Sequence, residues 1–294
     1  MISEPVEPVA VEKDLRLIQT AFSQPRQYRA RRLVYTVVSS RAGGLLIGVN
    51  LNPDRACNFD CAYCEVNRDA TAARAECDID AMVEDVDRLM AELAEHLPAA
   101  AFGEPEEDSG RPLHVAISGD GEPTLAPQFE EAVDALVHLR ARGRHPFFKL
   151  VLITNASGLD RAETRQGLRR FNSQDEIWAK LDGGTQERLD QVNGGEANLE
   201  RSLKNILDLA RRRPVIVQNL FPAIRGVGPS EGEIEDYAAR LKELKDAGAD
   251  IPLVQICSAT RPSARPENSH LPLKTLSGIA RRVRSVAGLR AEVF

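Results

Sequence analysis

Residues 57–64 read Cys-Asn-Phe-Asp-Cys-Ala-Tyr-Cys and place three of the five cysteines within eight residues. They follow an apolar run at 45–49 that is typical of a β-strand. Residues 50–76 show neither helical nor strand periodicity and predict a long loop, which in a compact domain often carries function. Three thiolates on one loop favour a bound metal or iron–sulfur cluster over a disulfide framework.

Strands and helices alternate on both sides of this loop. Before it, 33–38 and 45–49 read as β-segments around a turn at Gly43-Gly44. After it, apolar periodicity predicts helices over 79–97, 127–141, 160–170, 197–212, 231–247 and 273–286, and strands over 114–118, 148–154, 176–181, 215–220, 252–257 and 289–293. Six βα units predict an α/β fold, a partial (β/α)6 barrel of parallel strands, because eight units are needed to close a TIM barrel.

The first 32 residues differ from the rest. Residues 1–10 are acidic and contain proline, unlike a secretory signal, and 11–22 predict a short helix before a basic run at 29–32. We predict an N-terminal extension over 1–32 and one barrel domain over 33–294. The polar stretch 103–111 predicts an exposed loop within that domain.

Composition excludes several classes of protein. With 43% hydrophobic and 28% charged residues, the chain is predicted to be neither disordered nor collagen-like. No apolar run approaches the length of a membrane-spanning helix, so no interaction with a membrane is predicted. The net charge of −6 gives no support for a nucleic-acid partner. An odd number of clustered cysteines predicts reduced thiols and a cytoplasmic location.

Several segments together resemble the radical S-adenosylmethionine (radical SAM) superfamily. Residues 57–64 match its signature C-x3-C-x-aromatic-C, with Tyr63 at the aromatic position. Residues 117–123, Ile-Ser-Gly-Asp-Gly-Glu-Pro, resemble the family's Gly-Gly-Glu-Pro segment, which contacts the amino group of SAM. Residues 154–155 and 180–182 end the next two strands, where the family often places polar contacts to SAM. The similarity runs from about residue 45 to the C-terminus.

This resemblance implies one [4Fe–4S] cluster held by Cys57, Cys61 and Cys64, with SAM on the iron that lacks a protein ligand. An electron from a flavodoxin- or ferredoxin-type donor would cleave SAM to a 5′-deoxyadenosyl radical, which takes hydrogen from a small-molecule or peptide substrate. Glu122 or backbone carbonyls of this segment are expected to accept a hydrogen bond from the SAM ammonium. The implied SAM-binding residues are Tyr63, Ser118, Gly119, Asp120, Gly121, Glu122, Pro123, Thr154, Asn155, Lys180 and Asp182.

Two alternatives stay open. The chain is most similar to wyosine-type, tRNA-modifying radical enzymes, but it lacks the cysteines that these carry ahead of the main motif for a second cluster. A tRNA substrate is therefore an alternative rather than the main hypothesis. The other alternative is a non-enzymatic metal-binding protein, for example a zinc site with Cys77 as the fourth ligand.

Lys180 and Cys257 are the candidate catalytic residues. Lys180 and Asp182 form either an ion pair at the rim or part of the pocket, where Lys180 would hold a carboxylate or form a Schiff base. Cys257 is either a small buried apolar residue or a hydrogen-atom donor to a substrate radical. Trp178, the single tryptophan, is predicted to pack in the core.

Overall fold

The structure is a computed structural model that describes residues 33–68, 76–96, 113–258 and 263–294. The predicted helix over 11–22, the N-terminal extension over 1–32 and the loop over 103–111 lie outside these residues. Among the described helices, none has the length and apolar character needed to cross a membrane.

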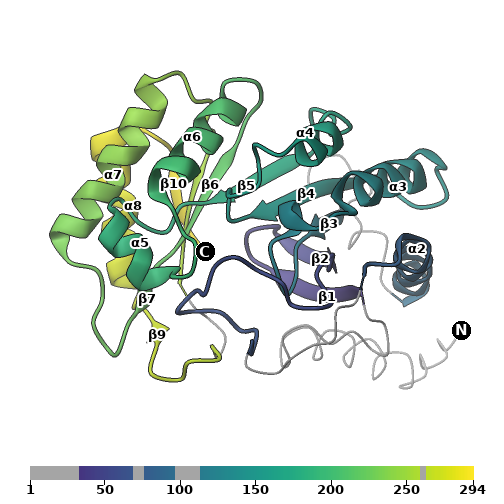
Figure 1. Ribbon diagram of the computed structural model, residues 1–294, viewed down its shortest axis with the longest axis horizontal. Coiled ribbons are helices and arrows are strands. Elements are labelled where there is room, and N and C mark those ends of the chain that lie inside the picture. The colour runs from purple at the N-terminus through teal and green to yellow at the C-terminus, as the bar shows by residue number, and fades with distance from the viewer. Residues whose placement is uncertain (1–32, 69–75, 97–112, 259–262) are drawn as a thin grey trace, which may run out of the picture.

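One curled sheet organises the described residues (Figure 1). Its order is β1-β2-β3-β4-β5-β6-β8-β10, in which β1 is antiparallel to β2 and every other neighbouring pair is parallel. The two edge strands, β1 and β10, do not pair with each other in the described chain, so the barrel stays open as predicted. The strands are β1 (Val34–Ser39), β2 (Gly44–Val49), β3 (Leu113–Ile117), β4 (Phe148–Thr154), β5 (Glu176–Lys180), β6 (Ile216–Leu220), β8 (Val254–Cys257) and β10 (Ala291–Val293).

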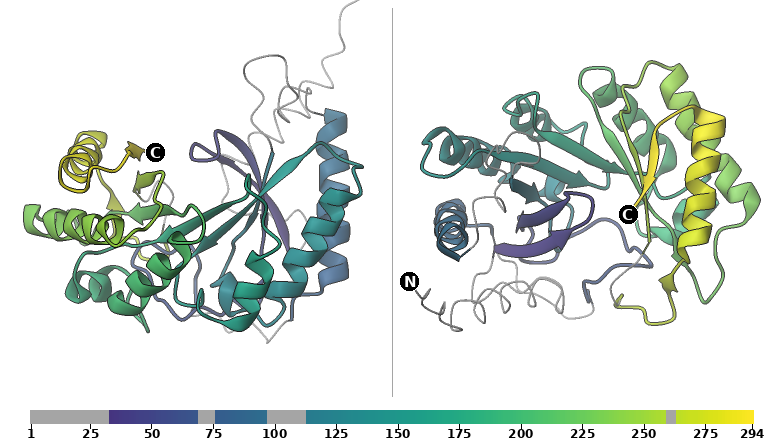
Figure 2. Two further views of the ribbon diagram at one scale, coloured as in Figure 1. Left: turned by 90° about the horizontal axis from the view of Figure 1, so that it is seen from above. Right: turned by 180° about the vertical axis from the view of Figure 1, so that it is seen from behind.

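Helices connect the parallel strands and lie on the outer face of the curled sheet (Figure 2). They are α2 (Ile79–His96), α3 (Phe129–Ala141), α4 (Ala162–Leu168), α5 (Gln186–Val192), α6 (Leu199–Ala210), α7 (Glu231–Asp246) and α8 (Leu273–Ala287), with a short 3₁₀ helix η2 (Pro123–Leu125). Two short strands, β7 (Pro222–Ala223) and β9 (Ser269–His270), form a separate antiparallel pair. The predicted α/β partial barrel of six βα units is confirmed.

The sequence analysis missed α5, which lies between β5 and α6. The Thr185 hydroxyl caps this helix by accepting a hydrogen bond from the Arg188 N–H. α7 begins with a capping box, in which the side chains of Ser230 and Glu233 each accept from the backbone N–H of the other. Such caps replace hydrogen bonds that a helix terminus lacks, so they fix where each helix starts.

Side-chain alternation along the strands builds two apolar layers. In β4, Leu150 and Leu152 belong to the main core between sheet and helices, while Val151 faces the barrel interior. The interior group also contains Ala42, Leu46, Ala116 and Trp178, and Trp178 is buried as predicted. The cysteine loop follows the C-terminal end of β2, which is also the end where the other parallel strands terminate.

Candidate functional site

A cavity of about 320 Å³ lies inside the open barrel. It brings together residues from the cysteine loop, the ends of β3 and β4, and β5, β6 and β8. Asp120, Pro123 and Asp182 do not line it. The other candidate residues from the sequence analysis do: Cys57, Cys61, Cys64, Tyr63, Ser118, Gly119, Gly121, Glu122, Thr154, Asn155, Lys180 and Cys257.

Each of the three loop cysteines accepts a hydrogen bond on its sulfur. The Phe59 backbone N–H lies 3.5 Å from Cys57 Sγ, and Asn193 Nδ2 lies 3.2 Å from Cys61 Sγ. Arg68 Nη2 lies 3.6 Å from Cys64 Sγ. Donors placed in this way stabilise the negative charge that a thiolate carries when it binds a metal.

Burial acts against ionisation of these thiols when they are not ligated. It raises the pKa of Cys57 to about 11 and that of Cys61 to about 12. A bound cation supplies the opposing charge and deprotonates the thiol that it ligates. The loop is therefore suited to thiolates that are neutralised by a metal centre.

Cys77 does not join the three loop cysteines. It is buried in the main core, and the charged groups that act on it are Asp78 and Glu131. In the described chain, no group of three His, Cys, Asp or Glu side chains is close enough to hold one metal ion, and this includes Cys57, Cys61 and Cys64. In a cubane cluster each of these thiolates would bind a different iron, so they need not converge on a single ion. The structure thus gives no support to a zinc site completed by Cys77.

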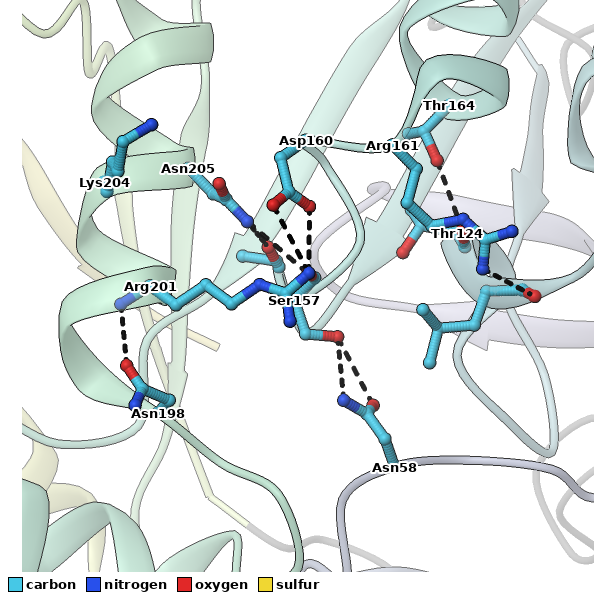
Figure 3. A network of polar contacts seen from close by, with 12 residues as sticks. Asn58, Thr124, Ser157, Asp160, Arg161, Thr164, Asn198, Arg201, Lys204 and Asn205 are labelled. Atoms are coloured by element: carbon cyan, nitrogen blue, oxygen red, sulfur yellow. Dashed lines mark hydrogen bonds and ion pairs between the residues drawn. The ribbon is translucent and has the colours of Figure 1, made fainter.

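Asn58, within the cysteine motif, ties the loop to the end of β4 (Figure 3). Its Nδ2 donates to Ser157 Oγ over 3.1 Å, and its Oδ1 accepts from Asn155 Nδ2 over 2.9 Å. Asn205 of α6 supports the same turn by donating to the Ala156 carbonyl over 2.9 Å. A helix and a strand end therefore fix the loop near Cys57.

Two distant segments hold the rest of the loop through its backbone. At the C-terminal end of α5, the carbonyls of Asn193 and Val192 accept from the N–H groups of Asp60 and Ala62, respectively, both over 2.7 Å. Further along the chain, Asn268 donates to the Ala62 carbonyl over 2.7 Å, and the Ala264 N–H donates to the Cys64 carbonyl over 2.7 Å. Arg265 also pairs with Asp60.

The Glu122 carboxylate is buried and accepts four hydrogen bonds from the protein. Oε1 accepts from the Thr124 N–H and hydroxyl and from the Thr154 hydroxyl, at 3.1, 2.6 and 2.6 Å. Oε2 accepts from the Asn155 N–H at 2.6 Å. Burial raises the pKa of Glu122, and these donors oppose the shift. Glu122 therefore joins the ends of β3 and β4, a role that the sequence analysis did not predict.

Gly121 brings the same strand end against the cysteine loop. A Cβ atom at this position would lie 1.9 Å from the Ala56 carbonyl oxygen, and the Glu122 N–H donates to that oxygen over 3.3 Å. Only glycine allows this approach. The segment that resembles the SAM-binding motif is thus packed directly on the residue before Cys57.

Tyr63 and Asp182 form the centre of a polar cluster beneath the cavity. The Tyr63 hydroxyl donates to Asp182, and Asn193 Nδ2 lies 2.8 Å from Asp182 Oδ2. The Leu220 N–H donates to Asp182 Oδ1 over 2.9 Å. Burial, reinforced by the Asp182 charge, raises the pKa of Tyr63 well above its usual value.

Lys180 faces the cavity above this cluster. Its Nζ lies 3.4 Å from Asp182 Oδ2 and 4.7 Å from the centre of the Tyr63 ring. The ion pair considered in the sequence analysis is therefore present, and the same ammonium lines the cavity. Cys257, at the end of β8, is a buried free thiol whose pKa is raised by burial, an effect that the nearby Arg41 and Lys180 oppose.

Residues 51–238 match the radical SAM superfamily, which is more than half of the chain. The chain belongs to this superfamily. Members of this superfamily bind a [4Fe–4S] cluster and SAM.

Relatives of this radical SAM chain include UPF0026 proteins. A UPF0026 protein from Helicobacter pylori is 25% identical over 228 residues, which cover 74% of this chain and 65% of the relative. A UPF0026 protein from Synechocystis is 29% identical over 169 residues, covering 57% and 54%. The chain thus spans less than two thirds of the length of the relatives it matches.

Solved structures share the fold of this chain at low sequence identity. A spore photoproduct lyase variant with bound AdoMet and dinucleoside spore photoproduct gives a TM-score of 0.57 at 13% identity, covering 97% of this chain and 93% of that one. TYW1 with a lysine–pyruvate adduct gives a TM-score of 0.55 at 15% identity, and the match covers 96% of this chain and 90% of that one. SuiB from Streptococcus suis, bound to SAM, gives a TM-score of 0.52 at 11% identity, and the match covers 100% of this chain and 54% of that one.

The donor set of the loop fits a radical SAM cluster. Three thiols line one cavity, each with an N–H donor, and thiolates are the usual ligands of iron–sulfur clusters. Asn193 and Arg68, which donate to two of these sulfurs, were not found by sequence reasoning. Asn193 is 132 residues from Cys61 along the chain, and no local motif connects them.

Gly195 offers a test of how tightly the loop is held. Its φ is +59°, and a Cβ there would lie 2.5 Å from the Asn58 carbonyl oxygen. Gly195→Ala is expected to lower stability by about 2–4 kcal/mol, adding a clash to the left-handed strain. It should also lower the iron bound after reconstitution, measured together with a urea titration.

Gly143→Ala is the matched control, because Gly143 has φ +63° with open space around its Cβ position. It should cost about 1–2 kcal/mol, from strain alone, and leave iron binding unchanged. Equal iron binding by the two variants would show that Gly195 does not position the cysteine loop.

Proposed function

We propose that Cys57, Cys61 and Cys64 hold the [4Fe–4S] cluster of this radical SAM enzyme, and that SAM binds beside them in the barrel cavity. The observation that carries the proposal is that three hydrogen-bonded thiols line the same cavity as the ends of β3 and β4. The residues at these strand ends that line the cavity are Ser118, Gly119, Gly121, Glu122, Thr154 and Asn155. When bound, these cofactors supply one-electron chemistry, in which reductive cleavage of SAM yields a radical that takes hydrogen from the substrate.

The protein positions SAM through strand ends that are rigidly joined. Glu122 fixes the ends of β3 and β4 relative to each other, so the cavity-lining atoms of Gly119, Gly121, Thr154 and Asn155 form one surface. Such a surface offers backbone carbonyls and side-chain oxygens to the ammonium of SAM. The interior position also excludes bulk water from the reacting groups.

We assign the substrate to small molecules or peptide side chains. This assignment follows the sequence resemblance, and the cavity of about 320 Å³ that would also hold SAM has room for only a small group of the substrate. The electron donor is a flavodoxin- or ferredoxin-type protein, since the reaction needs one electron. Modification of tRNA, the alternative from sequence resemblance, stays a prediction.

Lys180 and Cys257 stand where they would contact the substrate. The Lys180 ammonium faces the cavity and has an aromatic and a carboxylate neighbour, so it is held in place. It would bind a carboxylate or form a Schiff base with a carbonyl. The Cys257 thiol, buried and protonated, would return a hydrogen atom to a substrate radical.

The proposed function predicts about four irons and four sulfides per chain after anaerobic reconstitution. Addition of SAM and dithionite should then yield 5′-deoxyadenosine, measured by chromatography, above the level of unreconstituted protein. An EPR signal of a reduced cubane should change when SAM is added. Stoichiometric zinc without iron, or about eight irons per chain, would contradict the proposal.

A further inference from the structure

The turn between β1 and β2 closes the barrel interior at the end opposite the cysteines. The turn precedes β2 and the cysteine loop follows it, so the two are separated by the length of a six-residue strand, roughly 17 Å. Ala42 and Leu46 pack with Trp178 inside the barrel. Residues 37–41 of this hairpin line the cavity, so they form its floor.

Arg41 places a guanidinium on this floor. Its Cζ lies 5.8 Å from the centre of the Trp178 ring, and its charge acts on the Cys257 thiol. In the described part of the chain, no carboxylate forms an ion pair with Arg41. Two side-chain carboxylates line the cavity, and Glu122 is enclosed by four donors while Glu65 lies on the cysteine loop. The last residue of the chain, Phe294, also lines the cavity, and it forms no ion pair with Arg41 in the described residues.

A half-buried guanidinium without a counter-ion is electrostatically unfavourable, and a bound anion relieves this cost. The planar fork of arginine matches the two oxygens of a carboxylate or phosphate. Lys180, on the wall between Arg41 and the cysteine loop, adds a second positive charge to the same cavity. The cavity thus offers cations at the floor and at the wall.

We propose that Arg41 binds an anionic group of the substrate, a carboxylate or a phosphate, at the floor of the barrel. This inference rests on the proposed function and names its substrate class, a small molecule with an anionic end. Anchoring that end at Arg41 holds the molecule beside Cys257 in the cavity that the cysteine loop also lines. Arg41 is then a specificity-determining residue.

Trp178 provides a built-in reporter, because it is the only tryptophan of the chain and contacts Arg41. Full-length, cluster-loaded protein is titrated anaerobically with inorganic phosphate and, separately, with malonate at constant ionic strength, and Trp178 emission is followed. The parent is compared with R41M, R41K and R282M. R282M is the control, since Arg282 is an exposed arginine that pairs with Glu235.

We expect a saturable response in the parent and in R282M, and a dissociation constant about tenfold or more higher in R41M. The probe that binds more tightly distinguishes a phosphate from a carboxylate. R41K keeps the positive charge and loses the planar guanidinium, so it should bind the anion with intermediate affinity. If circular dichroism shows that R41M is unfolded, the affinity of R41K relative to the parent is the test.

Three results would overturn the inference. They are no saturable response of the parent to either probe, equal affinity of R41M and parent, and loss of the response at saturating SAM, which would assign Arg41 to SAM itself. SAM cleavage by the parent is measured on the same sample. Cleavage without anion binding overturns the inference alone, whereas anion binding without cleavage contradicts the proposed function.

Discussion

Cys61→Ala is expected to abolish SAM cleavage while the protein stays folded. Outer partners of a metal ligand are worth roughly 10–100-fold, so loss of the ligand itself should exceed a hundredfold. The loop keeps its backbone hydrogen bonds to Asn193, Val192 and Asn268, which do not use the Cys61 side chain. The unfolding midpoint should therefore fall by less than about 4 °C, equivalent to about 1 kcal/mol.

Circular dichroism, iron content and 5′-deoxyadenosine yield are measured on one sample of the variant. Cys77→Ala is the control, because Cys77 is also a free thiol but lies in the main core, and it should retain SAM cleavage. Cleavage by Cys61→Ala at the parent rate would remove this cysteine from the site. An unfolded Cys61→Ala protein would instead favour a structural metal.

Glu122→Ala is expected to lower the free energy of unfolding by about 3 kcal/mol or more. The change leaves four donors around Thr124, Thr154 and Asn155 without their acceptor in a buried site, and each unsatisfied donor costs roughly 1–3 kcal/mol before water enters. The affinity for SAM should fall as well, because the strand ends that line the cavity separate.

Urea titration and SAM binding to cluster-loaded protein test this together. Glu163→Ala removes an exposed carboxylate of α4 and should leave both quantities unchanged. If Glu122→Ala keeps parental stability and loses only SAM affinity, then Glu122 contacts SAM directly, as the sequence resemblance implies. If both quantities stay parental, Glu122 neither contacts SAM nor joins the strands.

Elements with a strong local signal were predictable from sequence. β4 was predicted with its observed bounds, 148–154, because its apolar run is flanked by turn-forming and polar residues. α5 was missed although it is as long as α4, because it lies between β5 and a second helix, α6, where simple strand–helix alternation predicts only one helix. Its N-cap at Thr185, directly after Gly183-Gly184, was the available signal.

For the candidate site, spacing revealed the residues that are close in sequence and missed those that are close only in space. The cysteine triplet and residues 118–123 are local motifs. Asn193 and Arg41 carry no such pattern, because an asparagine after a helix and an arginine in a hairpin turn usually face solvent. Asp182 was predicted from its strand end, but the fold places it behind Tyr63.

The backbone bonds that hold the cysteine loop set an order of events during protein synthesis. Asn268, which binds the Ala62 carbonyl, is 206 residues further along the chain. At 5–20 residues per second, a ribosome needs roughly 10–40 s to reach it after the loop has emerged. Until then the loop lacks this support, so we expect insertion of the iron–sulfur cluster to follow translation rather than accompany it, with the nascent cysteines kept reduced in the interval.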